Sequence, residues 1–594
     1  MTGRRKTAPG AGRFVWLFVL LAAMLLGVAA RLVWVQTVEA GSLAAKAEKQ
    51  RVRELVLTPR RGSIFDREGE PLAKTVDART IYAVPHAVKD ATGTAAVLAG
   101  ILGGDQAGYL KQLQRSSSFS YIARKVDLDR ASAVERLGIE GIGFLEDSRR
   151  TYPSGELACQ VLGFVGVDDN GLSGLEKYYD DVLTGQPGRV LAERDPYGRP
   201  IPGGVMESVD PVDGRSITLT IDKDIQYEAH VELAEAVARF GAKGGSITVM
   251  DPRSGEIYAM ASWPNYDPNS YAQADPRAFR NTVVTDAYEP GSTVKSFTAA
   301  AVIDRGLAEP ATMFHLPSTL KVGDRTIHES HDRGAVTWSL TDIVTKSSNV
   351  GAVKLGQALG KNDVYDYFRV FGLTERTGVD YPGEAKGWLP PPSQWSASSI
   401  GNVPFGQGIS MTVLQLTRAY AALANGGKLV TPHFLVRASG VTTEPVWPVR
   451  QAIPAATTAT MRDMLRAVVN DGTGASAAVP SYDVAGKTGT AQKPRIGGGG
   501  YIAGAYISSF AGFLPAVDPR IVIVVIIDEP TKGIYGGTVA APSFSRVAEF
   551  SVAHLKILPV VAPAATAAGN GAVSNPPAAG AKADPVLESS SSVR

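Results

Sequence analysis

An uncharged apolar run near the N-terminus constrains the fold most, because such a segment must be shielded from water. Residues 14–30 (FVWLFVLLAAMLLGVAA) contain no charged side chain, and residues 32–35 continue the run beyond Arg31. Seventeen residues are at the short end of what spans a bilayer, but Arg31 can extend its charge toward the interface. The apolar side chains surround the whole helix and do not form one stripe, which argues against a buried core helix. We therefore expect a membrane anchor over residues 14–36.

Cations before the run set its expected orientation. Arg4, Arg5, Lys6 and Arg13 precede it, which predicts that residues 1–13 are cytoplasmic and that the chain after residue 36 lies outside the cytoplasm. A cleaved signal peptide is the alternative, because Val28-Ala-Ala30 could serve as a small-residue cleavage site.

Composition excludes several classes of protein. The formal net charge is +2 without a dense basic stripe, so nothing favours nucleic acid as a partner. A single cysteine, Cys159, excludes an intrachain disulfide framework and a cysteine-built zinc site, and we expect it to be a small buried residue. We expect no metal and no cofactor. The 594 residues suffice for two to four domains of about 150 residues each.

Patterning divides the extracytoplasmic part into two blocks and a tail. Residues 37–214 begin with a charged, helix-prone connector (44–54) that Pro59 stops, and continue as short apolar runs, turns and a helical stretch at 95–102. We interpret this block as an irregular α+β pedestal domain. Residues 557–594, rich in alanine and proline, predict a disordered tail. No internal repeat is evident.

The second block, residues 215–556, is more regular. Residues 216–221 alternate as a strand, 225–240 have a helical period, and 246–250 with 257–260 predict a hairpin. Residues 520–527 (RIVIVVII) predict a central strand buried on both faces. Because strands are expected at both ends of the block, we expect them to pair in a single sheet that the two ends complete.

Ser292 lies in a pattern that suits nucleophilic catalysis. Pro290-Gly291 break the preceding structure, and residues 297–303 look helical, so we expect Ser292 in the first helical turn. Lys295 follows three residues later on the same helical face. A serine hydroxyl needs a base near neutral pH, and a lysine can serve when burial lowers its pKa. A lone Ser-x-x-Lys string is weak evidence, so its context decides.

Two later strings fit the same chemistry. Lys346-Ser-Ser-Asn-Val350 follows first, and it could alone be a helix cap. Gly486-Lys-Thr-Gly-Thr490 predicts an edge strand along which Gly489 lets a substrate backbone approach. Lys487 and the hydroxyls of Thr488 and Thr490 suit a terminal carboxylate, and the Thr490 N–H suits an acyl oxygen.

The ordered triple is shared by class A β-lactamases and penicillin-binding proteins. The chain resembles the class B penicillin-binding proteins from the anchor to about residue 556, most closely their division branch, the FtsI transpeptidases. Residues 280–281 and 285–286 (Arg-Asn and Thr-Asp) are similar to that branch in particular. Further matching strings are Arg61-Gly-Ser-Ile-Phe-Asp-Arg67, Arg150-Thr-Tyr-Pro-Ser-Gly-Glu156, Gly174-Leu-Glu-Lys-Tyr-Tyr-Asp180, Thr184-Gly-Gln-Pro-Gly188 and Tyr535-Gly-Gly537.

The resemblance implies a transpeptidase domain, an antiparallel sheet flanked by helices, behind the pedestal. It implies that Ser292 is the acylated nucleophile and Lys295 its general base. It further implies that Ser347 relays protons, Asn349 binds the donor amide, and Lys487 tunes the electrostatics of the site. The N–H groups of Ser292 and Thr490 would form the oxyanion hole.

Two departures from the family pattern are mild. Ser296 follows Lys295 where a proline is common, and Phe405-Gly-Gln-Gly408 replaces a Tyr-Gly-Tyr-Gly-like string. The tail has no counterpart in the pattern, so its role is unassigned.

The sequence therefore predicts a peptidoglycan D,D-transpeptidase that acts at the division septum and binds β-lactams. The expected partners are stem peptides, an FtsW-like membrane glycosyltransferase and other division proteins. An elongation or sporulation enzyme, a β-lactamase and a catalytically idle scaffold are the alternatives. A bifunctional class A synthase is excluded, because residues 37–215 are too few for a glycosyltransferase and lack its Glu-Asp-x-x-Phe-type string.

Overall fold

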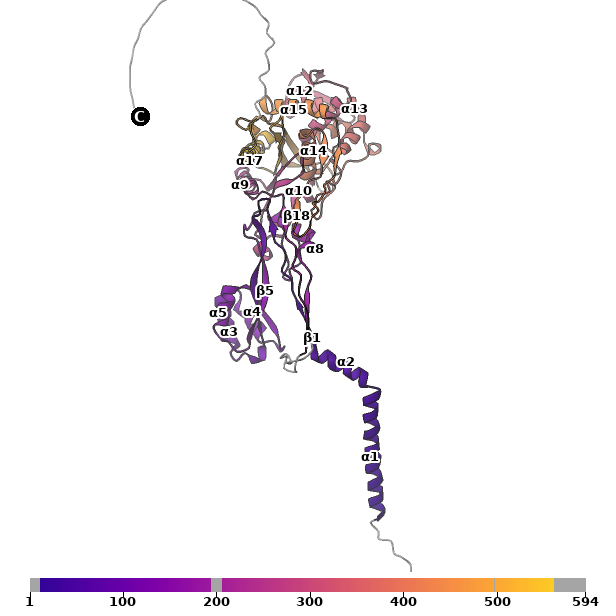
Figure 1. The fold of residues 1–594 in the computed structure, drawn as a ribbon. Helices are drawn as coiled ribbons and strands as arrows, with labels where there is room; N and C mark the ends of the chain where they lie inside the picture. The colour runs from indigo at the N-terminus through magenta and orange to yellow at the C-terminus, as the bar shows by residue number, and fades with distance from the viewer. Residues whose placement is uncertain (1–10, 194–205, 496, 560–594) are drawn as a thin grey trace, which may run out of the picture.

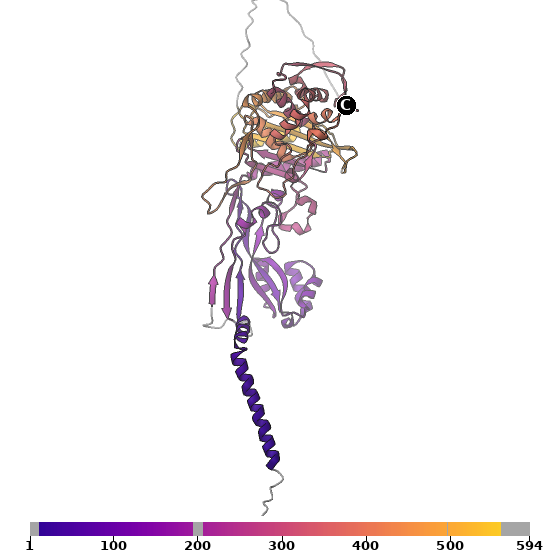
Figure 2. The same ribbon diagram turned by 90° about the vertical axis from the view of Figure 1, so that its right-hand side faces the viewer.

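The computed structural model describes residues 11–193, 206–495 and 497–559. Most of the expected N-terminal cytoplasmic segment and most of the Ala/Pro-rich tail lie outside the described residues. Figures 1 and 2 show a long N-terminal helix, then a slender β-rich region, then a larger α+β domain. This order agrees with the α+β multidomain class expected from the sequence.

The apolar run forms the long helix α1 (Ala11–Thr37). Within the described residues it is the one helix long and apolar enough to cross a membrane, with a mean hydropathy of 2.3 over its most apolar window and no buried part. Helix α2 (Ala40–Arg51) follows. The prediction of a connector helix over 44–54 is wrong at its C-terminal end, because residues 52–57 form strand β1 (Val52–Leu57). Antiparallel pairing with β6 (Gly188–Glu193) overrides the local helical preference there.

The pedestal contains two sheets. The smaller has the order β1-β6-β7, where β7 is Met206–Val209. The larger has the order β18-β8-β2-β3-β4, and β5 also pairs with β3. Its strands are β2 (Ile64–Phe65), β3 (Pro71–Ala83), β4 (Ser120–Asp127), β5 (Ile142–Thr151), β8 (Ile217–Leu219) and β18 (Leu435–Ala438). Three helices cover β3, β4 and β5 around an apolar cluster, and they are α3 (Ala91–Leu102), α4 (Gln106–Leu113) and α5 (Leu128–Glu135).

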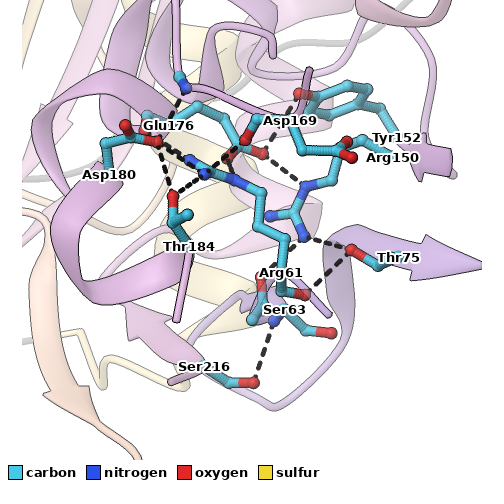
Figure 3. Close-up of polar contacts among 12 residues, drawn as sticks. Arg61, Ser63, Thr75, Arg150, Tyr152, Asp169, Glu176, Asp180, Thr184 and Ser216 are labelled. Atoms are coloured by element: carbon cyan, nitrogen blue, oxygen red, sulfur yellow. Dashed lines mark hydrogen bonds and ion pairs between the residues drawn. The ribbon is translucent and has the colours of Figure 1, made fainter. Parts of the chain in front are cut away.

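Four of the matching strings meet in one buried polar network in the pedestal, which includes a hydrogen bond from Arg61 Nη1 to Thr184 Oγ1 at 2.8 Å (Figure 3). Glu176 accepts hydrogen bonds from Arg61 Nε and from Arg150 Nε, each at 2.7 Å. Arg61 Nη1 also donates to Asp180 at 2.6 Å, and Tyr152 donates its hydroxyl to Glu176 at 3.2 Å. The Glu176 side chain is fully buried, and the side chains of Arg61 and Arg150 are 2% exposed. These strings therefore build the pedestal interior.

The C-terminal domain is built on a five-stranded antiparallel sheet with the order β10-β9-β22-β21-β20. Its strands are β9 (Gly244–Met250), β10 (Ile257–Trp263), β20 (Ala485–Pro494), β21 (Tyr501–Leu514) and β22 (Ile521–Asp528). The expected β9–β10 hairpin is confirmed, and β22 lies in the middle with almost every residue buried. Pairing of β9 with β22 closes the sheet with strands from both ends of the domain, as the sequence predicts.

Helices cover both faces of this sheet. Helices α9 (Lys223–Phe240) and α17 (Ala541–His554) pack on one face through residues such as Ile225, Ile523 and Phe544. On the other face, Phe297 of α11 (Lys295–Asp304) and Leu416 of α14 (Val413–Ala424) join a core with Val524. Helix α15 (Ala455–Asn470) also packs against β20, while α13 (Asn349–Val370) packs against α11 and α12 (Leu340–Thr345) packs against α15.

The two domains share structure across the sequence boundary near residue 215. The strand expected over 216–221 forms, as β8, but it pairs with β18 and β2 in the pedestal sheet and not in the five-stranded sheet. Tyr179 donates its hydroxyl to Asp380 at 2.5 Å, and Asp380 also accepts from the backbone N–H of Phe434 and Leu435. Cys159 is buried with a free thiol, as expected. The pedestal top and the C-terminal domain therefore form one continuous core.

The remaining elements are short. The helices are α6 (Cys159–Leu162), α7 (Gly174–Tyr178), α8 (Asp180–Leu183), α10 (Thr282–Thr285) and α16 (Gly536–Val539). The two-stranded pairs are β11 (Ala287–Tyr288) with β16 (Met411–Thr412), β12 (Met313–Leu316) with β15 (Val336–Ser339), β13 (Thr319–Val322) with β14 (Arg325–His328), and β17 (Lys428–Val430) with β19 (Val449–Gln451). The 3-10 turns are η1 (Pro85–Ala87), η2 (Pro268–Gln273), η3 (Pro276–Phe279), η4 (Gly291–Val294), η5 (Pro392–Gln394), η6 (Ser399–Gly401), η7 (Val403–Phe405) and η8 (Ala475–Ala477).

Candidate active site

Ser292 lies on the tight turn η4, which leads directly into α11. The sequence predicts the first turn of a helix, and the structure refines this to a 3-10 turn before the α-helix. Gly291 opens the turn with φ +57°, a backbone conformation that favours glycine. A Cβ at Gly291 would also lie 3.2 Å from the Thr490 carbonyl oxygen, so the turn packs closely against β20. Ser292 itself is half-buried.

Lys295 joins the serine string to the Ser-x-Asn string. Its Nζ donates to the Ser347 carbonyl at 2.6 Å, to Ser347 Oγ at 3.3 Å and to Asn349 Oδ1 at 2.7 Å. Within the described residues no hydrogen bond joins Lys295 to Ser292, although the two lie one helical turn apart. The ammonium therefore bridges the turn of the serine to the Ser-x-Asn string.

The environment of Lys295 lowers its basicity. The side chain is buried, with 1% of the residue exposed, and burial lowers the pKa of Lys295 to about 7 because a charge is poorly solvated there. The negative charge of Glu329 opposes this and raises the pKa. Near neutral pH a large share of Lys295 is therefore the free amine that a general base requires.

Glu329 is an important residue of the site that the sequence does not reveal. Its carboxylate accepts from the Asn349 backbone N–H and from Ser348 Oγ, each at 2.6 Å, and from Arg333 Nη2 at 2.5 Å. These bonds fix the first turn of α13, where a negative charge is also favoured by the helix dipole. Glu329 stands 18 residues before Ser347 in no recognisable string, so the one available signal was its charge.

The Lys-Thr-Gly-Thr string lies on the edge strand β20, as the sequence predicts. The Lys487 side chain is fully buried, and its Nζ donates to the Thr488 carbonyl at 3.2 Å and to Thr488 Oγ1 at 3.3 Å. Burial holds the pKa of Lys487 well below its usual value, and the charge of Lys295 lowers it further. The two lysines therefore disfavour a double positive charge in the site. Thr490 Oγ1 accepts from Gly536 N–H at 3.1 Å, which ties β20 to the Tyr-Gly-Gly string.

Gly489 is required by packing inside the protein. A Cβ at this position would lie 2.2 Å from Ser509 Oγ and 3.0 Å from Thr293 Cγ2. The first atom belongs to β21 and the second to η4, so glycine allows the turn of the serine to lie against the sheet. This role adds to the expected approach of a substrate backbone, which stays a prediction.

The two departures from the family pattern have local explanations. Ser296 is fully buried, and its Oγ lies 3.0 Å from the Tyr420 hydroxyl, so both polar groups are satisfied between α11 and α14. In the second string, Gly408 N–H donates to Glu289 Oε1 at 3.0 Å. Tyr501, at the start of β21, donates its hydroxyl to Glu289 Oε2 at 2.9 Å.

Two family models match the chain. The penicillin-binding protein transpeptidase domain matches residues 245–549, and the penicillin-binding protein dimerisation domain matches residues 56–219. The chain belongs to the class B penicillin-binding proteins. The first match contains the serine, Ser-x-Asn and Lys-Thr-Gly-Thr strings, and the second contains the buried network of Arg61, Arg150 and Glu176.

Similar class B penicillin-binding proteins carry several names. Penicillin-binding protein PbpB of Mycobacterium tuberculosis is 38% identical, with 89% of this chain and 83% of that protein covered. Stage V sporulation protein D of Bacillus subtilis is 35% identical, with 91% and 86% covered. Peptidoglycan D,D-transpeptidase FtsI of Escherichia coli is 35% identical, with 90% of each chain covered.

A solved structure gives the same fold. Penicillin-binding protein 3 of Mycobacterium tuberculosis, complexed with ampicillin, is 33% identical, and the match covers 86% of this chain and 98% of that one. The TM-score is 0.68. The expected fold of a pedestal followed by a transpeptidase domain is confirmed.

Proposed function

We propose that this chain is a membrane-anchored D,D-transpeptidase that cross-links peptidoglycan stem peptides through an acyl-enzyme on Ser292. The observation that carries the proposal is the buried Lys295, whose pKa is lowered to about 7 and whose Nζ contacts Ser347 and Asn349 one turn from Ser292. A base that is partly neutral at physiological pH is what a serine nucleophile needs.

In the first step, Ser292 Oγ attacks the carbonyl carbon between the two terminal D-alanines of the donor stem. A C–O bond forms, the hydroxyl proton passes to Lys295, and the N–H groups of Ser292 and Thr490 stabilise the oxyanion. Ser347 donates its hydroxyl proton to the departing amine and takes the proton back from Lys295, the C–N bond breaks and D-alanine leaves. Asn349 binds the donor amide, and Lys487 with Thr488 and Thr490 holds the terminal carboxylate.

In the second step, an amine of a neighbouring stem attacks the ester carbon. The new C–N bond forms, the bond to Ser292 Oγ breaks, and the proton of the amine returns to Ser292 through the same groups. β-Lactams acylate the same serine, because their strained amide imitates the donor. The proposed membrane anchor over residues 14–36, with its N-terminus in the cytoplasm, places this reaction outside the cytoplasm.

Mass spectrometry of the intact protein after penicillin treatment tests the acyl-enzyme. The wild type gains the mass of one penicillin, and Ser292→Ala does not. Ser270→Ala is the matched control, because that serine is exposed and should keep the adduct. An unlabelled wild type, or an adduct that persists on Ser292→Ala, would contradict the proposal.

The cellular role we propose is septal. It is supported by the FtsI-like residues Arg280, Asn281, Thr285 and Asp286, and it implies an FtsW-like glycosyltransferase as the partner that polymerises the strands. The sporulation relative is as similar as the FtsI relative, so an elongation or sporulation role is the second candidate. A fluorescent fusion should concentrate at mid-cell in dividing cells, and a sidewall signal would overturn the septal assignment.

A further inference from the structure

A cavity beside the Ser-x-Asn string has no part in the donor reaction described above. It measures about 420 Å³ and opens next to Lys346, which directly precedes Ser347. Its walls come from residues 329–333, from Trp338 and Lys346, and from residues 471–473. Two parts of the chain that are distant in the sequence, residues 329–346 and 471–473, therefore form it.

The cavity is linked to the catalytic groups on two sides. On one side Glu329 caps the helix that carries Asn349. On the other, Thr473 Oγ1 lies 2.7 Å from Thr488 Oγ1 of the Lys-Thr-Gly-Thr strand. The cavity therefore adjoins the end of the site where the terminal carboxylate of the donor is expected, which is where D-alanine departs.

Reaction chemistry assigns this end to the incoming amine. The acceptor nitrogen forms the bond that the D-alanine nitrogen has left, so it must occupy nearly the same position and exchange its proton with the same groups. The acceptor differs from D-alanine in one respect: its nitrogen belongs to a whole stem peptide. That peptide needs room beyond the leaving-group position, and the cavity provides it.

The charges of the cavity wall suit a peptide with charged groups of both signs. Lys346 is exposed, and its Nζ donates to the Asp471 backbone carbonyl at 2.8 Å, which leaves its positive charge without a carboxylate partner among the described residues. Asp332 is also exposed and forms no ion pair in the described part of the chain. Arg333, in contrast, is neutralised by Glu329 and lies over the ring of Trp338, with its guanidinium carbon 4.7 Å from the ring centroid. Asp471 also lines the cavity, is exposed and likewise forms no ion pair among the described residues, so the wall carries one unpaired cation and two unpaired carboxylates.

We infer that this cavity is the acceptor subsite, which holds the peptide chain of the incoming stem. Lys346 binds a carboxylate of that peptide and Asp332 binds an ammonium group other than the reacting one. This inference rests on the proposed transpeptidase function and assigns Lys346 and Asp332 as acceptor-positioning residues. Within the described residues neither forms a hydrogen bond or ion pair with Ser292, and neither has a role in the proposed donor reaction.

The experiment compares two acceptors on the full-length protein in detergent. A soluble thioester donor whose acyl group ends in D-alanine forms the acyl-enzyme, and product analysis gives the ratio of aminolysis to hydrolysis. D-Alanine, as acceptor, fills only the leaving-group position, whereas a soluble stem peptide with a free side-chain amine also reaches the cavity. Lys346→Gln and Asp332→Asn should each lower the ratio for the stem peptide about five- to tenfold, the scale of one ordinary hydrogen bond. The ratio for D-alanine and the rate of penicillin acylation should stay within about twofold.

Two further variants separate charge from structure. Lys346→Arg keeps the cation and should restore the stem-peptide ratio. Lys361→Gln is the matched control, because Lys361 also donates to a backbone carbonyl from an exposed position, that of Pro392. An equal loss with both acceptors, or no loss with either, would overturn the acceptor subsite while leaving the acyl-enzyme intact. A wild type that forms no acyl-enzyme would instead contradict the proposed function itself.

Discussion

At the scale of single residues, the buried amine of Lys295 should control the pH dependence. Its pKa is lowered to about 7, so the neutral base is the minor form at pH 6 and the major form at pH 8. The rate of penicillin acylation should therefore rise about tenfold as pH increases from 6 to 8, and then level off. Labelling with a fluorescent penicillin, quenched at fixed times, measures this profile. Circular dichroism at each pH verifies that the protein stays folded. A flat or falling profile would exclude Lys295 as the base.

Glu329 should shift that profile. Glu329→Gln removes the negative charge that raises the Lys295 pKa, so the midpoint should move to lower pH. The same change weakens the hydrogen bonds that fix Asn349, so the plateau rate should fall about five- to tenfold. The pH profile of penicillin labelling reports both effects. Glu444→Gln, at an exposed carboxylate, is the control and should leave both unchanged. A lower plateau with an unmoved midpoint would show that Glu329 acts only on geometry.

The sequence predicts the positions of some of these residues and not of others, and the difference has a physical reason. Ser292 and Lys295 lie three apart on one turn, so their proximity follows from local backbone geometry. The contact of Lys295 with Asn349 crosses 54 residues, and only the shared pattern of strings indicates that the two residues belong to one site. Glu329 belongs to no such string, and its position under α13 depends on a loop whose path no local preference sets.

At the scale of elements, the fit of η4 against β20 should depend on Gly489. Gly489→Ala would place a Cβ 2.2 Å from Ser509 Oγ, so the turn of the serine or the strand must move. We expect a loss of about 1–3 kcal/mol in the free energy of unfolding, the usual cost of overpacking. We also expect penicillin acylation to fall at least about tenfold, since a displacement near 1 Å disrupts attack geometry.

Denaturant unfolding and penicillin labelling measure the two effects. Gly100→Ala is the control, because Gly100 lies in α3 with no atom within 4 Å of its Cβ position, and alanine there should stabilise the helix slightly. Unchanged acylation by a folded Gly489→Ala protein would contradict this account of the turn.

Elements with strong local patterns are the ones that the sequence predicts well. The apolar run of β22 and the helical period of α9 need no distant information, and both form as expected. Strand β1 is not predicted in this way. Its residues continue a helix-prone stretch, and their pairing partner, β6, lies more than 130 residues further along the chain. Long-range pairing decides such segments, and local propensity does not report it.

At the scale of the whole molecule, the pedestal and the transpeptidase domain are joined by pairings that the sequence does not display. Strand β8 lies between β2 and β18, so residues near 64, 217 and 435 share one sheet. Asp380 extends the junction, because it accepts from Tyr179 of the pedestal and from the backbone of the transpeptidase domain. A boundary drawn by composition separates the domains, whereas their cores are continuous.

This continuity gives the buried polar network in the pedestal (Figure 3) a consequence for the whole chain. Glu176→Gln would leave Arg61 and Arg150 buried without their shared carboxylate. Removing one partner of a buried ion pair typically costs about 3–5 kcal/mol, because the remaining charge is uncompensated. Thermal unfolding of the detergent-solubilised protein should show a markedly lower midpoint. Arg79→Gln breaks an ion pair with the exposed Glu135 in the same pedestal and should cost at most about 1 kcal/mol.

Penicillin labelling during the same thermal ramp tests the coupling of the two domains. Because one core runs through both, the loss of labelling in Glu176→Gln should follow the lowered unfolding midpoint, although no residue of the network contacts Ser292. At 25 °C, where the variant stays folded, its acylation rate should remain within about twofold of the wild type. A variant that keeps labelling well above its unfolding midpoint would show that the transpeptidase domain is stable without the pedestal, and that the shared sheet positions the catalytic domain without stabilising it.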